Sequence, residues 1–180
     1  MSDLELRQRG LLDLVKNRGG PFSDPYLRRV ANSRELEMVR KIALWWRAHA
    51  LEAQCRFTTR LLKKRDCFEV IVADFFDHNA TSPFVEELSL AFLGSLHDHD
   101  DHLIRAISQF ELALLRTRAG SVHAYEIMWD RNPDRVVLAL ETGDELPACE
   151  SGCQYRMRIG NDLPQMIVCN REPTSEDSFV

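Results

Sequence analysis

Apolar residues recur every three or four positions through residues 66–115, and this spacing predicts three consecutive amphipathic helices. Asp66 and Glu69 have the spacing of a capping box, so the first helix should begin at Asp66 and end near Asn79. The apolar side chains of this helix should form one buried stripe, made of Phe68, Ile71, Val72, Phe75 and Phe76.

Two further helices follow along the chain. Ser82 and Pro83 combine a capping residue with a first-turn proline, which predicts that the second helix begins there. The third helix should begin near Asp101, where either Asp100 or Asp101 can cap it. The predicted inward positions are Phe84, Leu88, Ala91 and Phe92 in the second helix and Leu103, Ile107, Phe110 and Leu114 in the third.

The first 65 residues also have helical patterns. Residues 4–17 should form a helix that ends before the Gly19-Gly20-Pro21 breaker, and residues 25–30 should form one short turn. Asn32-Ser33-Arg34-Glu35 indicates the start of a long helix, which continues or restarts through Phe57 to Leu62. Its buried stripe is predicted to consist of Leu36, Val39, Ile42, Ala43, Trp46 and Ala50.

The spacing changes after Gly120. Residues 122–129 and 135–140 are rich in β-forming residues and are separated by a turn-forming segment, which predicts one hairpin. Residues 154–159 and 165–169, joined by 160–164, predict a second.

Together these patterns predict an α+β protein. It should contain an N-terminal all-helical domain of residues 1–118, a small antiparallel β-rich domain of residues 119–172 and a flexible tail of residues 173–180.

Apolar and polar side chains alternate along residues 154–159. A small open sheet has edges and can bury only one face. One interpretation is an ordinary strand with a solvated polar face. The other is an edge strand that pairs with an extended peptide, whose acidic side chains would be bound by the arginines. The predicted peptide-binding residues are Gln154, Tyr155, Arg156, Met157, Arg158 and Ile159.

The net charge of -5 is unevenly distributed. Residues 1–65 carry 15 Lys or Arg against 7 Asp or Glu, whereas residues 66–180 are acidic. Such polarity can reflect either a basic surface for an acidic partner or attraction within the molecule, and we favour the second interpretation. The acid-rich remainder would repel phosphate and no recognition helix is evident, so we expect no nucleic-acid partner and rank a DNA-binding regulator last.

The sequence predicts a cytoplasmic protein without a membrane partner. No apolar run approaches the roughly 20 residues of a spanning helix, and the N-terminus lacks the order of a signal peptide. Five cysteines, an odd number, indicate reduced thiols rather than a disulfide framework.

Candidate metal ligands gather at His97-Asp98-His99-Asp100-Asp101-His102. Neighbouring side chains point in different directions, and a metal shell needs a further ligand from elsewhere, so we favour a solvated turn. Cys149 and Cys153 with Cys169 lack the usual zinc spacing and a fourth ligand. We therefore expect no metal, no bound cofactor and no catalytic residue in this chain, with a metal-binding enzyme as the main alternative.

Four segments resemble a known family: Trp45-Trp46-Arg47, residues 67–76, residues 82–93 and residues 110–114. In this order they resemble the helical partner proteins of multinuclear non-haem iron-dependent oxidative enzymes in the biosynthesis of ribosomally made, modified peptides (RiPP biosynthesis). The resemblance covers residues from about 40 to 115 and is nearest to the TglI-like, MbnC-like and HvfC-like proteins. The β-rich end is similar in kind only.

This resemblance implies a non-catalytic subunit that binds a precursor or carrier peptide and a TglH-like iron enzyme, forming a heterodimer. The iron would belong to the partner enzyme. For the TglI-like case the implied reaction of the complex is oxidative excision of the β-carbon of a C-terminal cysteine, in 3-thiaglutamate biosynthesis. In related complexes the implied product is an oxazolone and thioamide.

Overall fold

The computed structural model describes residues 2–16, 20, 22–79, 84–151, 153–163 and 167–173. The chain forms two compact units, one of residues 1–50 and 69–80 and one of residues 51–68 and 81–180. We call them unit 1 and unit 2. The boundary does not follow the change of sequence pattern near residue 118, because several helices pack with the sheet in unit 2. Among the described residues, no helix is long and apolar enough to cross a membrane.

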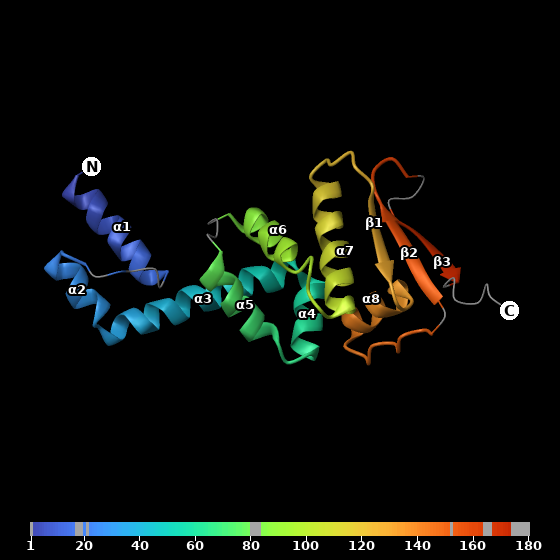
Figure 1. Ribbon diagram of the computed structural model, residues 1–180, viewed down its shortest axis with the longest axis horizontal. Helices are drawn as coiled ribbons and strands as arrows, with labels where there is room; N and C mark the ends of the chain where they lie inside the picture. The colour runs from blue at the N-terminus through green and yellow to red at the C-terminus, as the bar shows by residue number, and fades with distance from the viewer. Residues whose placement is uncertain are drawn as a thin grey trace. The chain divides into compact units, whose positions relative to one another are not determined.

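Unit 1 contains α1 (Asp3–Val15), α2 (Pro25–Ala31), most of α3 (Arg34–Gln54) and most of α5 (Phe68–His78) (Figure 1). Ser2 and Glu5 form a capping box at α1, and Asp24 caps α2 next to Pro25. The Ser33 hydroxyl accepts a hydrogen bond from the Leu36 backbone N–H at 3.3 Å, which confirms the predicted start of α3. A small core links α1, α2 and α3 through Leu14, Leu27 and Leu36.

The apolar stripe predicted for α3 is mostly wrong. Leu36 is buried, but Trp45 and Trp46 are each 60% exposed, and Met38, Val39 and Ile42 are exposed as well. Arg40 and Arg47 are half-buried instead. Within unit 1 this helix therefore turns its largest aromatic side chains outward and two arginines inward.

Unit 2 is built around α7 (His102–Arg118), which packs against α4 (Arg56–Lys64), α6 (Val85–Ser95) and the first strand (Figure 1). Asp101 caps α7 by accepting hydrogen bonds from the backbone N–H groups of Leu103 and Ile104, at 2.8 and 3.2 Å. This confirms one of the two predicted caps. The predicted cap of α6 at residues 82–83 lies outside the described residues, whereas α5 begins at Phe68, later than a cap at Asp66 would place it.

The core of unit 2 continues from the helices into the sheet through aromatic rings. The ring centroids of Phe57 and Phe110 lie 5.9 Å apart, and those of Phe110 and Trp129 lie 6.0 Å apart. Trp129 is fully buried. The helical and β-rich parts of the sequence thus share one core here.

The N-terminus of α4 is capped from another helix. Its own N-cap residue, Cys55, makes no side-chain hydrogen bond to the helix. The Glu111 carboxylate on α7 instead accepts hydrogen bonds from the backbone N–H groups of Phe57 and Thr58, both at 2.8 Å. Burial raises the pKa of Glu111, and these hydrogen bonds oppose that rise. Glu111 therefore joins α4 to α7 through buried polar contacts.

The sheet has three antiparallel strands in the order β1-β2-β3: β1 (Tyr125–Trp129), β2 (Cys153–Ile159) and β3 (Ile167–Pro173) (Figure 1). The second predicted hairpin is confirmed, because β2 and β3 pair from Ile159↔Ile167 to Cys153↔Pro173. The predicted flexible tail falls outside the described residues, except for Pro173 at the end of β3.

The predicted strand at residues 135–140 is wrong, since this segment lies in helix α8 (Pro133–Thr142). Asn132 accepts hydrogen bonds from the backbone N–H groups of Asp134 and Arg135, and Pro133 occupies the first turn. Val136, Ala139 and Leu140 are buried at helical spacing while Leu138 is exposed. The cap and this periodicity outweigh the β propensity of two adjacent valines. The α+β class is nevertheless confirmed.

Candidate functional site

The two faces of β2 differ as the alternation of its sequence predicts. Tyr155, Met157 and Ile159 are buried, whereas Gln154 and Arg158 are exposed and Arg156 is half-buried. In the register Met157 lies opposite Ile127 and Tyr155 lies opposite Trp129. One face of β2 therefore belongs to the core of unit 2, and the polar face lies on the outside of the sheet.

The predicted edge position of residues 154–159 is wrong. β2 is the central strand and pairs with β1 on one side and β3 on the other, so its backbone cannot accept an added peptide strand. The prediction failed because residues 135–140 form part of α8 and not a strand. Because that segment is a helix, β1 pairs with β2 instead of forming its own hairpin.

The polar face of the sheet carries a partly neutralised pair of arginines. An Arg156 terminal nitrogen lies 3.2 Å from a Glu126 carboxylate oxygen, and Arg158 stands opposite Glu126 in the register. Across β3, Arg158 stands opposite Val168 and Arg156 opposite Asn170. Arg158 is exposed and Arg156 is half-buried, so Arg158 is the more exposed cation of this face, and β3 lies between it and this edge of the sheet.

The outer edge of β3 carries the candidate site for a peptide backbone. Among the described residues, no backbone hydrogen bond connects this edge to another segment of the chain. Every second residue of an edge strand directs its N–H and C=O groups away from its partner strand. Among residues 2–16, 20, 22–79, 84–151, 153–163 and 167–173, the sheet thus retains an unpaired edge, although on a different strand from the one predicted.

A recess of about 560 Å³ lies beside the end of β3, lined by Asn132, Arg135, Pro147, Ala148, Cys149, Glu150, Tyr155 and Arg171. Glu150 organises it: one carboxylate oxygen accepts a hydrogen bond from the Tyr155 hydroxyl at 2.7 Å and lies 3.6 Å from an Arg171 nitrogen. The hydrogen bond to Glu150 raises the pKa of Tyr155 because it stabilises the protonated phenol. The charged groups of this recess are two arginines and one glutamate.

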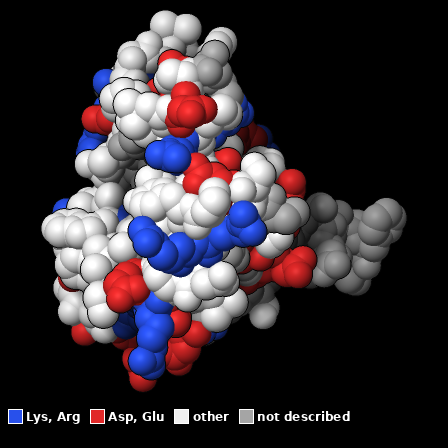
Figure 2. Space-filling model, turned by 90° about the vertical axis from the view of Figure 1, so that its left-hand side faces the viewer, with Lys and Arg blue, Asp and Glu red and all other residues white. Residues whose placement is uncertain are grey.

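Three basic residues of α4, Arg60, Lys63 and Lys64, and the adjoining Arg65 interact within unit 2. Arg60 donates hydrogen bonds to the carbonyls of Leu140 and Glu141, and Lys64 donates to those of Gly143 and Asp144, at the C-terminus of α8. Cations at a helix C-terminus offset its partial negative charge. Lys63 pairs with Glu52 and Arg65 with Asp101. These contacts support the intramolecular interpretation of the charge pattern for this cluster. On the face shown in Figure 2, basic and acidic side chains lie interspersed.

The histidines of residues 97–102 have separate neighbours. His97 lies 3.2 Å from the Gln109 amide, His99 accepts a hydrogen bond from the Asp101 backbone N–H, and His102 lies 3.9 Å from Asp130. A bidentate interaction with Arg131 lowers the pKa of Asp130. Within the described ranges, no three His, Cys, Asp or Glu side chains are grouped so that they could hold a metal ion.

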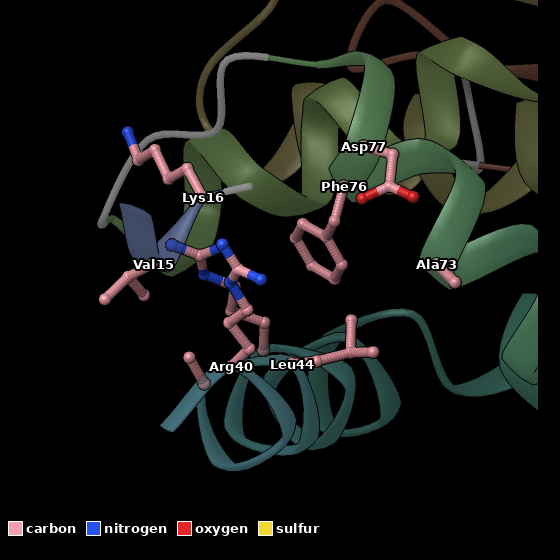
Figure 3. Close-up of a pocket in the computed structure, with 9 residues that line it drawn as sticks. Val15, Lys16, Arg40, Leu44, Ala73, Phe76 and Asp77 are labelled. Carbon is pink, nitrogen blue, oxygen red and sulfur yellow. The ribbon is translucent and has the colours of Figure 1, made fainter. Parts of the chain in front are cut away.

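Unit 1 contains a cavity that the sequence did not predict. It has a volume of about 210 Å³ and is lined by Val15 and Lys16 of α1, by Arg40, Ala43, Leu44 and Arg47 of α3 and by Ala73, Phe76 and Asp77 of α5 (Figure 3). The prediction failed because it placed the apolar stripe of α3 inward, whereas Arg40 and Arg47 lie outside that stripe and are half-buried. Positions 40, 43, 44 and 47 do have the spacing of one helix face, and this was the available signal.

Comparison of the chain with protein-family models, curated proteins and solved structures finds no match.

Proposed function

We propose that this chain is a non-catalytic cytoplasmic subunit that holds a ribosomally made precursor peptide for a TglH-like iron-dependent oxidative enzyme, as a heterodimer with that enzyme. The iron and the oxidative chemistry belong to the partner. The resemblance of residues 45–47, 67–76, 82–93 and 110–114 to partner proteins of such enzymes supports this proposal. In the TglI-like case, the peptide would end in the cysteine whose β-carbon is removed.

The observation that supports the peptide-binding role is the outer edge of β3, which pairs with no other segment that the structure describes. An extended peptide can add there as a fourth strand, because main-chain hydrogen bonds to an exposed edge supply affinity for almost any sequence. The strand would lie about 5 Å from β3. This proposal keeps peptide recognition on the sheet but moves the backbone contact from β2 to β3.

Side chains next to that edge would select the sequence of the peptide. Positive groups lie on both sides of β3. They are Arg158 on the polar face of the sheet and Arg135 and Arg171 at the recess. Glu150, which lies 3.6 Å from Arg171, and Glu126, which stands opposite Arg158 in the register, offset part of this charge. The arrangement favours a peptide with acidic side chains, since carboxylates form the strongest hydrogen bonds with guanidinium groups.

Replacing Arg158 with glutamate should weaken binding of the precursor peptide by roughly tenfold or more, because a charge-assisted hydrogen bond contributes about 1.5–3 kcal/mol. Calorimetric titration of the purified chain with the precursor peptide of its proposed complex measures this effect. Arg118→Glu is the matched control, since Arg118 is an exposed arginine of unit 2 that belongs to α7 and not to the sheet. Equal affinity of both variants and the unaltered chain would remove Arg158 from the peptide site.

The partner enzyme alone should convert the precursor at a small fraction of the rate of the complex, because the peptide would lack its binding subunit. Product formation by the iron enzyme, measured by mass spectrometry with and without this chain, tests the assignment directly. Co-purification of the two chains is the accompanying observation. Full activity of the enzyme by itself, or conversion of the peptide by this chain alone, would contradict the proposal.

A further inference from the structure

The inward face of α3 is cationic, which is unusual for the packed side of an amphipathic helix. Arg40 and Arg47 are about two turns apart and therefore lie on the same face. Both are half-buried, while Met38, Ile42 and Trp45 are exposed. Keeping long apolar side chains in water and arginines against other helices gives up hydrophobic burial. The contacts of the two arginines therefore have to account for their half-buried positions.

Each arginine is oriented by a neighbour inside unit 1. The Arg40 Nε donates a hydrogen bond to the Leu14 carbonyl at the end of α1, at 2.8 Å. The Arg47 guanidinium lies over the Phe76 ring, with its central carbon 5.4 Å from the ring centroid. In Figure 3 the Arg40 side chain rises from α3 toward α1, and the Phe76 ring faces the same space from α5. The two cations are thus held at one cavity.

These contacts leave hydrogen-bond donors without an acidic partner. A guanidinium carries five N–H donors. Among the described residues, no ion pair includes Arg40 or Arg47. The cavity lining contains Lys16, Arg40 and Arg47 against a single carboxylate, Asp77. The cavity therefore has an excess of positive charge.

We propose that this cavity is a binding site for a peptide carboxylate, which Arg40 and Arg47 hold by charge-assisted hydrogen bonds. A guanidinium presents a planar pair of donors that matches a carboxylate. Val15, Leu44, Ala73 and Phe76 supply apolar walls beside the charged groups. An aliphatic stem that ends in a carboxylate, as in a glutamate side chain, has both properties.

The size and charge of the cavity narrow the ligand class. At about 210 Å³ it is smaller than the roughly 300–1,000 Å³ of sites for whole small molecules, so it suits one side chain or a chain end rather than a cofactor. Asp77 would repel a doubly charged phosphate more strongly than a singly charged carboxylate. The site is separate from the sheet edge, so it adds a second point of peptide recognition to the proposed function.

Nuclear magnetic resonance titration of the full chain, followed at the arginine Nε–H signals, tests this site. Four probes separate the possibilities: N-acetylglutamate α-amide carries only the side-chain carboxylate, N-acetylglutamine only the terminal one, N-acetylglutaminamide neither, and inorganic phosphate represents a general anion. We expect a saturable shift of the Arg47 signal with at least one of the first two probes and none with the neutral amide. Whichever of the first two probes binds more tightly shows whether the site prefers a side-chain carboxylate or a C-terminal one.

Arg47→Gln should reduce the affinity for the carboxylate probe by roughly tenfold or more, while Arg47→Lys should retain part of it. Arg118→Gln is the matched control and should bind like the unaltered chain. Arg47 is the preferred position because Arg40 also binds the Leu14 carbonyl, and its loss would disturb α1. Thermal unfolding of each variant verifies that the helices persist.

Three results would overturn the proposal: no saturable shift with either carboxylate, equal shifts with the neutral amide, or affinity unchanged by Arg47→Gln. Tighter binding of phosphate than of both carboxylates would overturn the ligand class. None of the probes is long enough to add a strand to β3. Failure at this cavity is therefore distinguishable from failure of the peptide-binding role of the sheet.

Discussion

Glu111→Ala should lower the free energy of unfolding by about 2–4 kcal/mol, because it leaves a buried N–H group, that of Thr58, and a part-buried one, that of Phe57, without acceptors. The Glu111 side chain is 5% exposed, so water cannot readily replace it. The cost of burying a carboxylate, which also raises the pKa of Glu111, offsets part of the gain from its hydrogen bonds. The net loss on removing the group is nevertheless large.

Urea unfolding followed by circular dichroism measures this loss. The thermal midpoint should fall as well, by roughly 2–4 °C for each kcal/mol in a protein of this size. Glu87→Ala is the matched control, because Glu87 is an exposed glutamate in the first turn of α6. It should change the unfolding free energy by at most about 1 kcal/mol. A Glu111→Ala variant as stable as the Glu87→Ala variant would contradict the role of Glu111 as a cap.

Trp129→Ala should lower the free energy of unfolding by about 3–5 kcal/mol, the usual cost of deleting a fully buried aromatic side chain. Trp129 is the largest of the fully buried side chains and contacts Phe110 in an edge-to-face arrangement, with an interplanar angle of 72°. Phe110 in turn contacts Phe57. The alanine would leave a cavity where the sheet meets α7.

Trp129→Phe tests whether Trp129 stabilises the core by packing alone. No acceptor for the Trp129 indole N–H is found among the described residues, so phenylalanine would lose no hydrogen bond and should cost much less than alanine. Urea unfolding gives both values. Because Trp45 and Trp46 are exposed, removal of Trp129 should also shift the tryptophan emission of the folded protein to longer wavelength. Equal destabilisation by both variants, or no shift, would contradict this account of the core.

Apolar spacing together with capping residues predicted where most helices lie, although not the cap of α5 or the buried face of α3. α7 is an example, since Asp101 caps it and Leu103, Ile107 and Phe110 are buried as expected. The alternation along β2 likewise predicted which side chains face the core. Both features follow from local periodicity, which the chain carries within a few residues.

The errors arose where local preference competed with partners far along the chain. Val136 belongs to a helix because Asn132 and Pro133 start one, although its neighbourhood favours strand residues. This single change turned β2 from an edge strand into the central strand. In α3 the burial of the arginine face depends on α1 and α5, so the spacing of residues 40, 43, 44 and 47 could not by itself show that this face is buried. Glu111 was missed for the same reason, since its acceptor role depends on α4, more than 50 residues away.

The way the chain is divided limits how it can be dissected. Unit 1 consists of two stretches, residues 1–50 and 69–80, with part of unit 2 between them. A fragment cut near residue 118 would contain α7 but not Ile127, Trp129 or Met157, so the apolar side of α7 would meet water. No single cut of the chain separates one complete unit from the other. Point substitutions rather than shortened fragments are therefore the suitable way to determine the function of each unit.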